Sequence, residues 1–405
     1  MSRTSRSQLG IAARVRHRVA VVTNSATLSG VVTGIEAVYA PRWADEGDAV
    51  GLVVGEPDAS VERVLFAIDP VSVVVQEAID YGADLLIVHH PLLYRPVRSV
   101  AADSPKGRVI TDLIRHGIAL YAAHTNADSP PRGVSQSLAG ALGLTRLRPI
   151  VVHASDELDK IVTFVPRADA QRVLEALASA GAGAIGDYDR CAYLGEGQGT
   201  FRPGAEARPA VGRVGQIEVV DETRLEMVLP RFRRSDVLQA LRSSHPYEEP
   251  AFDVLELANC DVDRGSGRIG ELEEPVTLRS FASRVADTLP VTAGGARVSG
   301  DLDQPVRRVA VLAGAGDFLL DEVRRSGADV YVTSDLRHHP ASELREYDGA
   351  PALIDVPHWA AEWTWLPVAQ QTLSDGWRAR GWTITSEVSR LCTDPWNYRA
   401  GSGLG

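Results

Sequence analysis

The sequence Gly-Ala-Asp-Leu-Leu-Ile-Val-His-His-Pro at residues 82–91 indicates how this chain folds. Residues 85–88 form an uninterrupted apolar run, which is typical of a buried strand. Another apolar run lies at 64–68, and the segment 71–81 between the two carries apolar residues at helical spacing. Strand, helix and strand in this order predict a β-α-β unit. Further strands and helices as far as residue 143 extend it to an α/β lobe with a largely parallel sheet.

A similar segment, Gly-Ala-Asp-Val-Tyr-Val-Thr-Ser-Asp, occupies residues 327–335, and His-His-Pro follows it at 338–340. Apolar runs predict strands at 309–312 and 352–356, and the periodicity of 318–325 predicts a helix. The repeated pattern predicts a second α/β lobe that is similar to the first, as an internal duplication would produce. Because the matching stretch is short, a chance similarity is the alternative.

The middle of the chain follows a different pattern. Predicted strands at 161–165, 225–228 and 251–257 alternate with predicted helices at 168–180 and 234–243. This order, with a long stretch rich in Gly, Pro and Arg, predicts a ferredoxin-like α+β module inserted between the two lobes. The predicted boundaries are a basic, disordered extension at 1–30, a first lobe at 31–155, the inserted module at 156–262 and a second lobe at 263–405.

Length, charge and cysteine content exclude several classes of protein. The 405 residues include 42 Lys and Arg against 53 Asp and Glu, a net charge of −11, which argues against general nucleic-acid binding. No apolar run approaches the ~18 residues that a membrane-spanning helix requires, so no membrane association is expected. The three cysteines, Cys191, Cys260 and Cys392, are far apart and fit a reducing cytoplasm better than a disulfide framework.

The first 18 residues contain five arginines and no acidic residue. Polar residues interrupt the apolar stretch that follows, whereas a secretory signal has a continuous apolar segment and a cleavage site of small residues. A disordered tail, or a start codon placed too far upstream, is therefore favoured over a signal peptide.

Imidazole and carboxylate groups follow three of the predicted strands. His89 and His90 come directly after one strand, the motif His-Thr-Asn-Ala-Asp that ends at Asp128 follows another, and His358 and Glu362 follow a third. The last pair is four residues apart, which places both side chains on one face of a helix. The carboxyl ends of strands in an open α/β sheet face the ligand crevice, so these groups are expected to share it. Taken singly, they have simpler interpretations as hydrogen-bonded histidines, a helix cap and a surface pair.

Together the five side chains form a metal-ligand set without thiolate. Imidazole with carboxylate suits zinc, manganese, iron or nickel at an open site rather than a structural zinc site. Five ligands suit two divalent ions about 4 Å apart, with a metal-bridging hydroxide as the nucleophile of a hydrolase. The positive charge would attract a small anionic substrate. His124 and His339 are candidates for a catalytic acid or base, and the segment 334–339 is expected to line the same cleft.

The order of these motifs resembles the GTP cyclohydrolase 1 type 2 homologue family, whose members are NGG-interacting-factor-like dinuclear metal proteins. The resemblance spans roughly residues 31–399 and rests on Gly-Leu-Val-Val-Gly at 51–55, His-His-Pro-Leu at 89–92, His-Thr-Asn-Ala-Asp at 124–128, and Asp-Val-Pro-His at 355–358 with Glu362. It implies that two metal ions are bound by His89, His90, Asp128, His358 and Glu362. Ala127 and Pro357 depart from the family pattern, which usually has leucine and glycine there, but neither departure removes a ligand.

The resemblance also implies two similar α/β lobes, a toroidal homohexamer and, in the longer members, an inserted module resembling the signalling protein PII and the copper-tolerance protein CutA. Glu-Gly-Gln-Gly-Thr-Phe-Arg-Pro at 196–203 and His-Pro-Tyr-Glu-Glu-Pro at 245–250 match such an insert. Within it, His245 and Glu248 are expected to be structural or to lie at a subunit contact rather than to bind a metal.

These observations predict a cytoplasmic, dinuclear-metal-dependent hydrolase of a nucleotide or another phosphorylated small molecule. The alternative is a non-catalytic, hexameric metal-binding scaffold or regulator that senses a metabolite or binds partners through the insert. Neither nucleic acid nor a membrane is expected as a partner.

Overall fold

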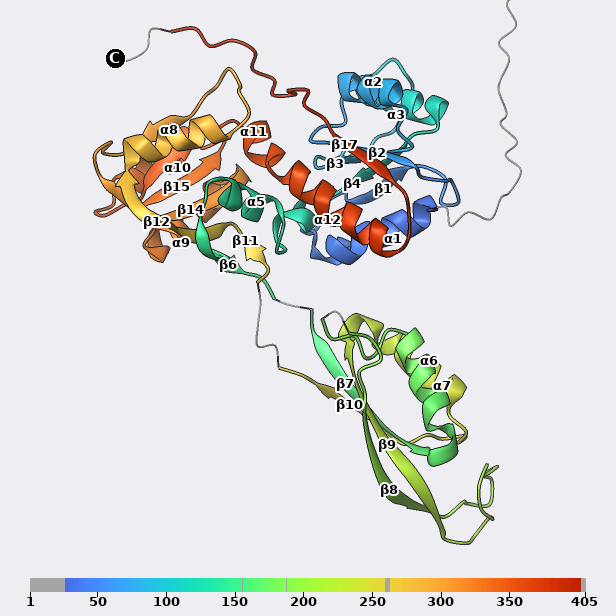
Figure 1. The fold of residues 1–405 in the computed structure, drawn as a ribbon. Coiled ribbons are helices and arrows are strands. Elements are labelled where there is room, and N and C mark those ends of the chain that lie inside the picture. The colour runs from blue at the N-terminus through green and yellow to red at the C-terminus, as the bar shows by residue number, and fades with distance from the viewer. Residues whose placement is uncertain (1–25, 155, 187, 259–262, 402–405) are drawn as a thin grey trace, which may run out of the picture. The chain divides into compact units, whose positions relative to one another are not determined.

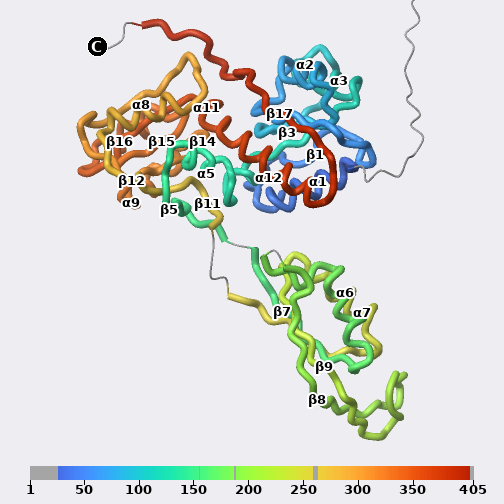
Figure 2. Tube along the Cα trace, viewed as in Figure 1, coloured from blue at the N-terminus to red at the C-terminus, as the bar shows by residue number. Residues whose placement is uncertain are grey.

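The computed structural model describes residues 26–154, 156–186, 188–258 and 263–401. These residues form two compact units (Figure 1; Figure 2). One unit combines the chain up to residue 147 with the chain from residue 270 onward, and the other spans 148–269. Among the described residues, no helix combines the length and the apolar character that a membrane span needs.

The predicted N-terminal extension at 1–30 overlaps the beginning of the described fold. Residues 26–30 belong to the fold, because Thr27 caps helix α1 (Leu28–Val38) by accepting a hydrogen bond from the Gly30 backbone N–H, and Leu28 is buried. The rest of that extension, residues 1–25, lies outside the described residues, and so does Cys260.

The first lobe of the larger unit is built on a five-stranded sheet in the order β1-β4-β3-β2-β17. Strands β17, β2, β3 and β4 are parallel, and β1 pairs antiparallel with β4 at one edge. Helices α2 and α3 cover one face, and α1 and α12 lie on the other (Figure 1). The bounds are β1 Gly51–Val54, β2 Arg63–Ala67, α2 Ser72–Tyr81, β3 Leu85–Val88, α3 Pro105–His116, β4 Ala119–Ala122, α12 Trp365–Ala379 and β17 Thr385–Val388.

The second lobe has a six-stranded sheet in the order β13-β16-β15-β14-β12-β5. Its centre repeats the first lobe, with β14, β15 and β16 parallel and β13 antiparallel at the edge of β16. Helices α5 and α11 pack against β14 and join both lobes in one apolar core. The bounds are α5 Val134–Ala141, β5 Thr145–Arg148, β12 Arg268–Thr277, α8 Leu278–Thr288, β13 Arg297–Ser299, β14 Pro305–Ala315, α9 Leu320–Ser326, β15 Val330–Ser334, α10 His338–Arg345, β16 Ala352–Asp355 and α11 His358–Trp363.

The two matching sequence segments occupy the same place in the two lobes. Gly82 and Gly327 each end a helix in the left-handed conformation, with φ of 70° and 71°. Two residues later, Asp84 and Asp329 each accept two hydrogen bonds from consecutive backbone N–H groups of the neighbouring strand region, at 2.7–2.8 Å. The His-His-Pro at 338–340 is not the counterpart of the one at 89–91, because it lies at the start of α10.

The smaller unit has the element order β-α-β-β-α-β. Its four strands form an antiparallel sheet in the order β10-β7-β9-β8, and α6 and α7 pack on it around one apolar core. The bounds are β7 Leu158–Pro166, α6 Ala170–Ser179, β8 Tyr193–Phe201, β9 Glu218–Pro230, α7 Arg234–Ser244 and β10 Phe252–Glu256.

Candidate metal centre

His89 and His90 both face one site although they are adjacent in sequence. They follow β3, and their backbone N–H groups still bond to the carbonyls of Ala67 and Ile68, so the pairing with the neighbouring strand region persists past the strand end. His89 is 1% exposed, and its Nδ1 donates to the Ala123 carbonyl at 2.8 Å. The Nδ1 of His90 lies 2.7 Å from the Asp69 carboxylate.

The short helix α4 (Thr125–Asp128) supplies the next groups, directly after β4. His124 precedes the helix, and its Nδ1 lies 2.9 Å from Asp48 Oδ1. Both the backbone N–H and the hydroxyl of Thr125 donate to the same Asp48 carboxylate, which fixes its position. Asp128 ends the helix, on the side of the imidazoles, with Oδ1 3.7 Å from His89 Nε2.

The second lobe contributes helix α11. His358 and Glu362 lie one turn apart, with His358 Nε2 2.7 Å from Glu362 Oε1. The Nδ1 of His358 lies 2.7 Å from Asp335 Oδ2. Asp335 follows β15 and has φ of 55°, a left-handed conformation that is uncommon for a residue other than glycine.

The Glu362 carboxylate lies between imidazoles from both lobes. Its Oε1 is 3.5 Å from His89 Nε2, and its Oε2 is 3.0 Å from His90 Nε2. The structure thus brings together all five residues that the sequence singled out as metal ligands. Ligand atoms lie within 4.8 Å of one another in two groups, one of His89, His90 and His124 and the other of His90, His358 and Glu362.

The cluster has the chemistry of a metal site. Each of the four imidazoles has its Nδ1 against an oxygen acceptor, which leaves Nε2 as the ligand atom; such outer partners are general among metal-binding histidines. Asp128 Oδ1 is buried and has no hydrogen-bond partner among the described residues, and Glu362 Oε2 has only the His90 imidazole beside it, at 3.0 Å. A buried carboxylate oxygen without a donor is costly unless a cation compensates it. The cluster could therefore hold a metal ion.

The electrostatics of the site show how strongly its groups depend on one another. Burial alone would lower the pKa of His90 and His358, but the charges of Glu362 and of their Nδ1 partners raise both pKa values to about 10. Burial would raise the pKa of Glu362, but the surrounding imidazoles hold it well below its usual value. Burial raises the pKa of Asp128 to about 6. A metal ion would compete with protons for these nitrogens, because a histidine binds metal through its neutral imidazole.

A cavity of about 620 Å³ opens beside His90 and His358. Its walls include Arg297, Arg399 and the indole of Trp396, which is 73% exposed. The C-terminal segment that carries Trp396 is hydrogen-bonded to the site. The Thr393 hydroxyl donates to Oδ2 of Asp69, whose Oδ1 lies against His90.

The sequence predicted the candidate ligands, but it predicted fewer of the carboxylates that lie against the histidine Nδ1 atoms. Asp335 lies in the segment expected to line the cleft, but Asp48 and Asp69 were missed. Asp69 stands just past the end of a predicted strand, which was a usable signal, whereas Asp48 lies in a loop that offered none. His339 is exposed on α10 beside His338 and belongs to neither ligand group.

Known proteins resemble this chain in sequence and in fold. The sequence profile of Duf34/NIF3 (NGG1p interacting factor 3) matches residues 26–395. The chain belongs to the Duf34/NIF3 family. A Mycobacterium tuberculosis protein named GTP cyclohydrolase 1 type 2 homolog is 46% identical over 376 residues, covering 92% of this chain and 97% of its own. A Bacillus subtilis protein of the same name is 41% identical over 357 residues, 88% of this chain and 90% of its own.

Solved structures of the Duf34/NIF3 family share the fold. The crystal structure of a Bacillus cereus protein related to NIF3 has a TM-score of 0.79 and 37% identity, and the match covers 93% of this chain and all of that one. The resemblance inferred from the sequence motifs is thereby confirmed, together with the mixed α/β fold.

Proposed function

We propose that this protein is a dinuclear-metal-dependent hydrolase of a nucleotide or another phosphorylated small molecule. The observation that supports it most is the meeting of four imidazoles and two carboxylates from two lobes, where the buried Asp128 Oδ1 has no hydrogen-bond partner among the described residues. Bound divalent cations would lower the pKa of a water molecule and polarise the substrate.

In this proposal the two lobes share the metal ions through Glu362. His89 and Asp128 would hold one ion, His90 and His358 the other, and the Glu362 carboxylate would contribute to both. His124 lies beside the cluster with its Nδ1 on a carboxylate, an arrangement suited to moving a proton at Nε2.

The substrate would occupy the cavity beside His90 and His358. Arg297 is already bound to Asp355, whereas Arg399 forms no ion pair with any described residue and is available to an anion. Trp396 offers a flat apolar surface on which a planar ring can stack. These features suit a small anionic molecule.

Metal content is the first test. Purified protein should contain close to two zinc, manganese, iron or nickel ions per chain by elemental analysis, before or after reconstitution. Glu362→Ala should lose most of this metal, whereas Glu343→Ala, on the exposed face of α10, should not. Well under one ion per chain after reconstitution would refute the metal centre.

Turnover is the second test. We expect metal-dependent hydrolysis of at least one member of a panel of nucleotides and phosphoesters, and loss of that activity in Glu362→Ala. The alternative, a metal-binding regulator without turnover, is supported by the separate unit at 148–269, which has a cavity of its own. If the metal-loaded protein hydrolyses no member of the panel, that alternative is favoured.

Three further predictions are part of the proposal. The unit at 148–269 would be an inserted ferredoxin-like module, as its element order and strand order suggest. The chain would act in the cytoplasm as a homohexamer. Sedimentation equilibrium should then give about six times the 43.5 kDa chain mass, and a monomer would contradict it.

A further inference from the structure

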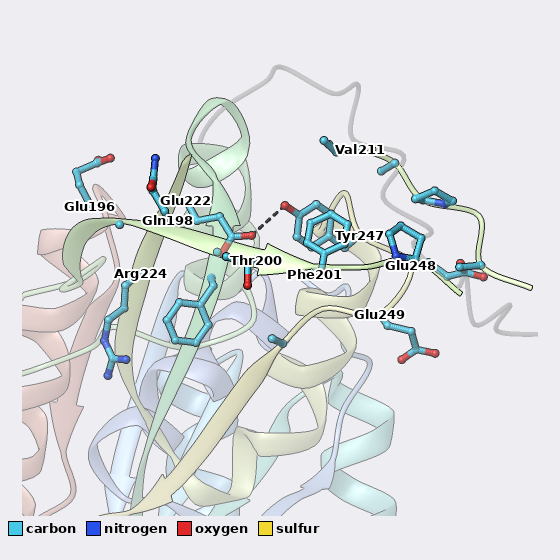
Figure 3. Close-up of a pocket in the computed structure, with 18 of the residues that line it drawn as sticks. Glu196, Gln198, Thr200, Phe201, Val211, Glu222, Arg224, Tyr247, Glu248 and Glu249 are labelled. Atoms are coloured by element: carbon cyan, nitrogen blue, oxygen red, sulfur yellow. Dashed lines mark hydrogen bonds between the residues drawn. The ribbon is translucent and has the colours of Figure 1, made fainter. Parts of the chain in front are cut away.

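The sheet of the smaller unit carries a cavity of about 790 Å³ that contains none of the metal-ligand candidates (Figure 3). It is lined by β8 and the segment 203–211 that follows, by β9, and by residues 247–251. Its volume is typical of small-molecule sites.

Aromatic rings form much of the wall. Phe201 and Tyr247 pack edge to face with ring centroids 5.6 Å apart, and Phe164 also lines the cavity. The Arg224 guanidinium already lies over the Phe164 ring, 5.5 Å from its centroid, so one of these rings holds a cation from within the chain. The ring pair of Phe201 and Tyr247 has no such partner among the described residues.

The charge of the lining is negative. Glu196 is neutralised by Arg167, and Arg224 by Glu226. The other lining carboxylates form no ion pair with any described residue; they are Glu222, Glu248 and Glu249. An anionic ligand would be repelled by this cavity, and a cationic one attracted.

Glu222 is the polar group best placed to fix a ligand. Its side chain is 8% exposed, and its Oε1 accepts a hydrogen bond from the Tyr247 hydroxyl at 2.9 Å (Figure 3). Its Oε2 has no hydrogen-bond partner among the described residues. That oxygen lies over Gly199, where a Cβ would come within 2.0 Å of it, so only glycine leaves it this space. Because Oε1 already accepts from Tyr247, Oε2 is the oxygen that an N–H group of a ligand would approach.

The nearby His245 does not compete for this role. Its Nε2 donates to the Phe164 carbonyl at 3.0 Å, and its Nδ1 accepts from the Tyr247 backbone N–H at 3.0 Å. Both ring nitrogens are therefore used within the chain, and the imidazole holds Tyr247 in place.

We infer that this cavity binds a small organic cation, an ammonium or guanidinium group on an apolar body, with Glu222 as its charged partner and Phe201 and Tyr247 around the cation. The aromatic walls distinguish this ligand from a bare metal ion, which would gain nothing from them. The site does not depend on the proposed hydrolase activity.

Calorimetric titration of the full chain with three matched probes tests the inference. Benzylammonium should bind once per chain, benzyl alcohol about tenfold more weakly or worse, and benzoate not at all. Glu222→Gln, which keeps an acceptor for Tyr247, should weaken benzylammonium binding by about tenfold. Asp236→Asn on α7 is the matched control and should leave binding within about twofold, because that carboxylate lies outside the cavity lining and is paired with Arg233. Phe201→Leu provides a second variant if Glu222→Gln fails to fold, and it should weaken binding several-fold.

Equal binding of benzylammonium and benzyl alcohol, or benzylammonium affinity unchanged in Glu222→Gln, would overturn the assignment. Failure of benzylammonium to bind would also overturn it, even if the reason is that a second copy of the chain covers the cavity. Manganese that binds at Glu222 while benzylammonium does not would also overturn it. The Glu362→Ala chain should bind benzylammonium like the wild type, which separates this result from any failure of the metal centre.

Discussion

The two lobes of the larger unit share a set of residues that support the backbone, here called the frame: Gly55 and Asp84 in the first lobe, Gly300 and Asp329 in the second. They differ in the side chains at the ends of their strands. Gly55 and Gly300 take φ values of 141° and 152°, and at each a Cβ would come within 2.8 Å of an alanine at the start of the paired strand. Asp84 and Asp329 hold the backbone of the neighbouring strand region in the same way. Both pairs are 245 positions apart in the sequence. The frame positions thus tolerate little change in either lobe.

The strand ends, by contrast, have diverged. The same spacing of 245 aligns His89 with Ser334 and His90 with Asp335. The first lobe therefore offers two imidazoles at this end of its sheet, and the second offers a hydroxyl and a carboxylate. The side chains at these positions take no part in the backbone hydrogen bonds of the sheet, so they can change without loss of the fold. If the proposed metal centre exists, the first lobe supplies two candidate ligands at these positions, whereas Asp335 of the second lobe supports the candidate ligand His358.

The largest effect should come from removing an imidazole at one of two aligned positions. His89→Ala should lower metal affinity by more than about 100-fold, because the loss of even an outer partner of a ligand costs about 10–100-fold. Ser334→Ala is the matched control. Ser334 is fully buried, and its hydroxyl has no hydrogen-bond partner among the described residues, so its loss should leave metal affinity unchanged.

Competition titration with a chromophoric chelator measures both affinities. An equal loss of affinity in the two variants would show that the aligned positions act through the fold rather than through ligation. Unchanged affinity in His89→Ala would remove that residue from the ligand set.

A smaller effect is expected from the carboxylates behind the imidazoles. Asp69 supports His90 in the first lobe, and Asp335 supports His358 in the second. Asp69→Asn and Asp335→Asn should each lower metal affinity by about 10–100-fold, because a carboxylate orients the ring and makes it a stronger ligand. Similar losses would show that the lobes contribute equally, whereas a loss confined to one variant would assign the tighter site to that lobe. The same chelator titration measures both, with Asp321→Asn on α9 as the control.

The sequence predicted the strands and the meeting of the candidate ligands for a physical reason. The apolar runs at 85–88 and 330–332 and the glycines before them depend only on local spacing, and ligands at strand ends follow directly from where the strands stop. The second His-His-Pro, at 338–340, suggested a counterpart of residues 89–91. That suggestion was wrong, because these residues begin a helix instead of following a strand.

The supports of the site could not be predicted in the same way. Asp48 reaches His124 from a loop 76 residues earlier, and Asp69 reaches His90 across two neighbouring strand ends. The contact of Asp48 depends on how its loop returns over the sheet, for which neither periodicity nor spacing gives a signal. Asp69 stands just past a predicted strand, but nothing in the local sequence pairs it with His90. The cavity of the smaller unit depends likewise on the path of the segment 203–211.

The smallest effect tests the shared frame itself. Asp84→Ala and Asp329→Ala each remove a carboxylate that accepts two backbone hydrogen bonds, so each should lower the free energy of unfolding by about 1–3 kcal/mol. Urea titration of the metal-free chain measures the change, and Asp84→Asn and Asp329→Asn, which keep an acceptor oxygen, should recover part of it. Because the two aspartates make the same contacts, the two losses should be close to each other. If only one of the two variants lowers the free energy of unfolding, the other lobe does not need its aspartate for stability. The similarity of the two lobes at this position would then reflect common origin alone.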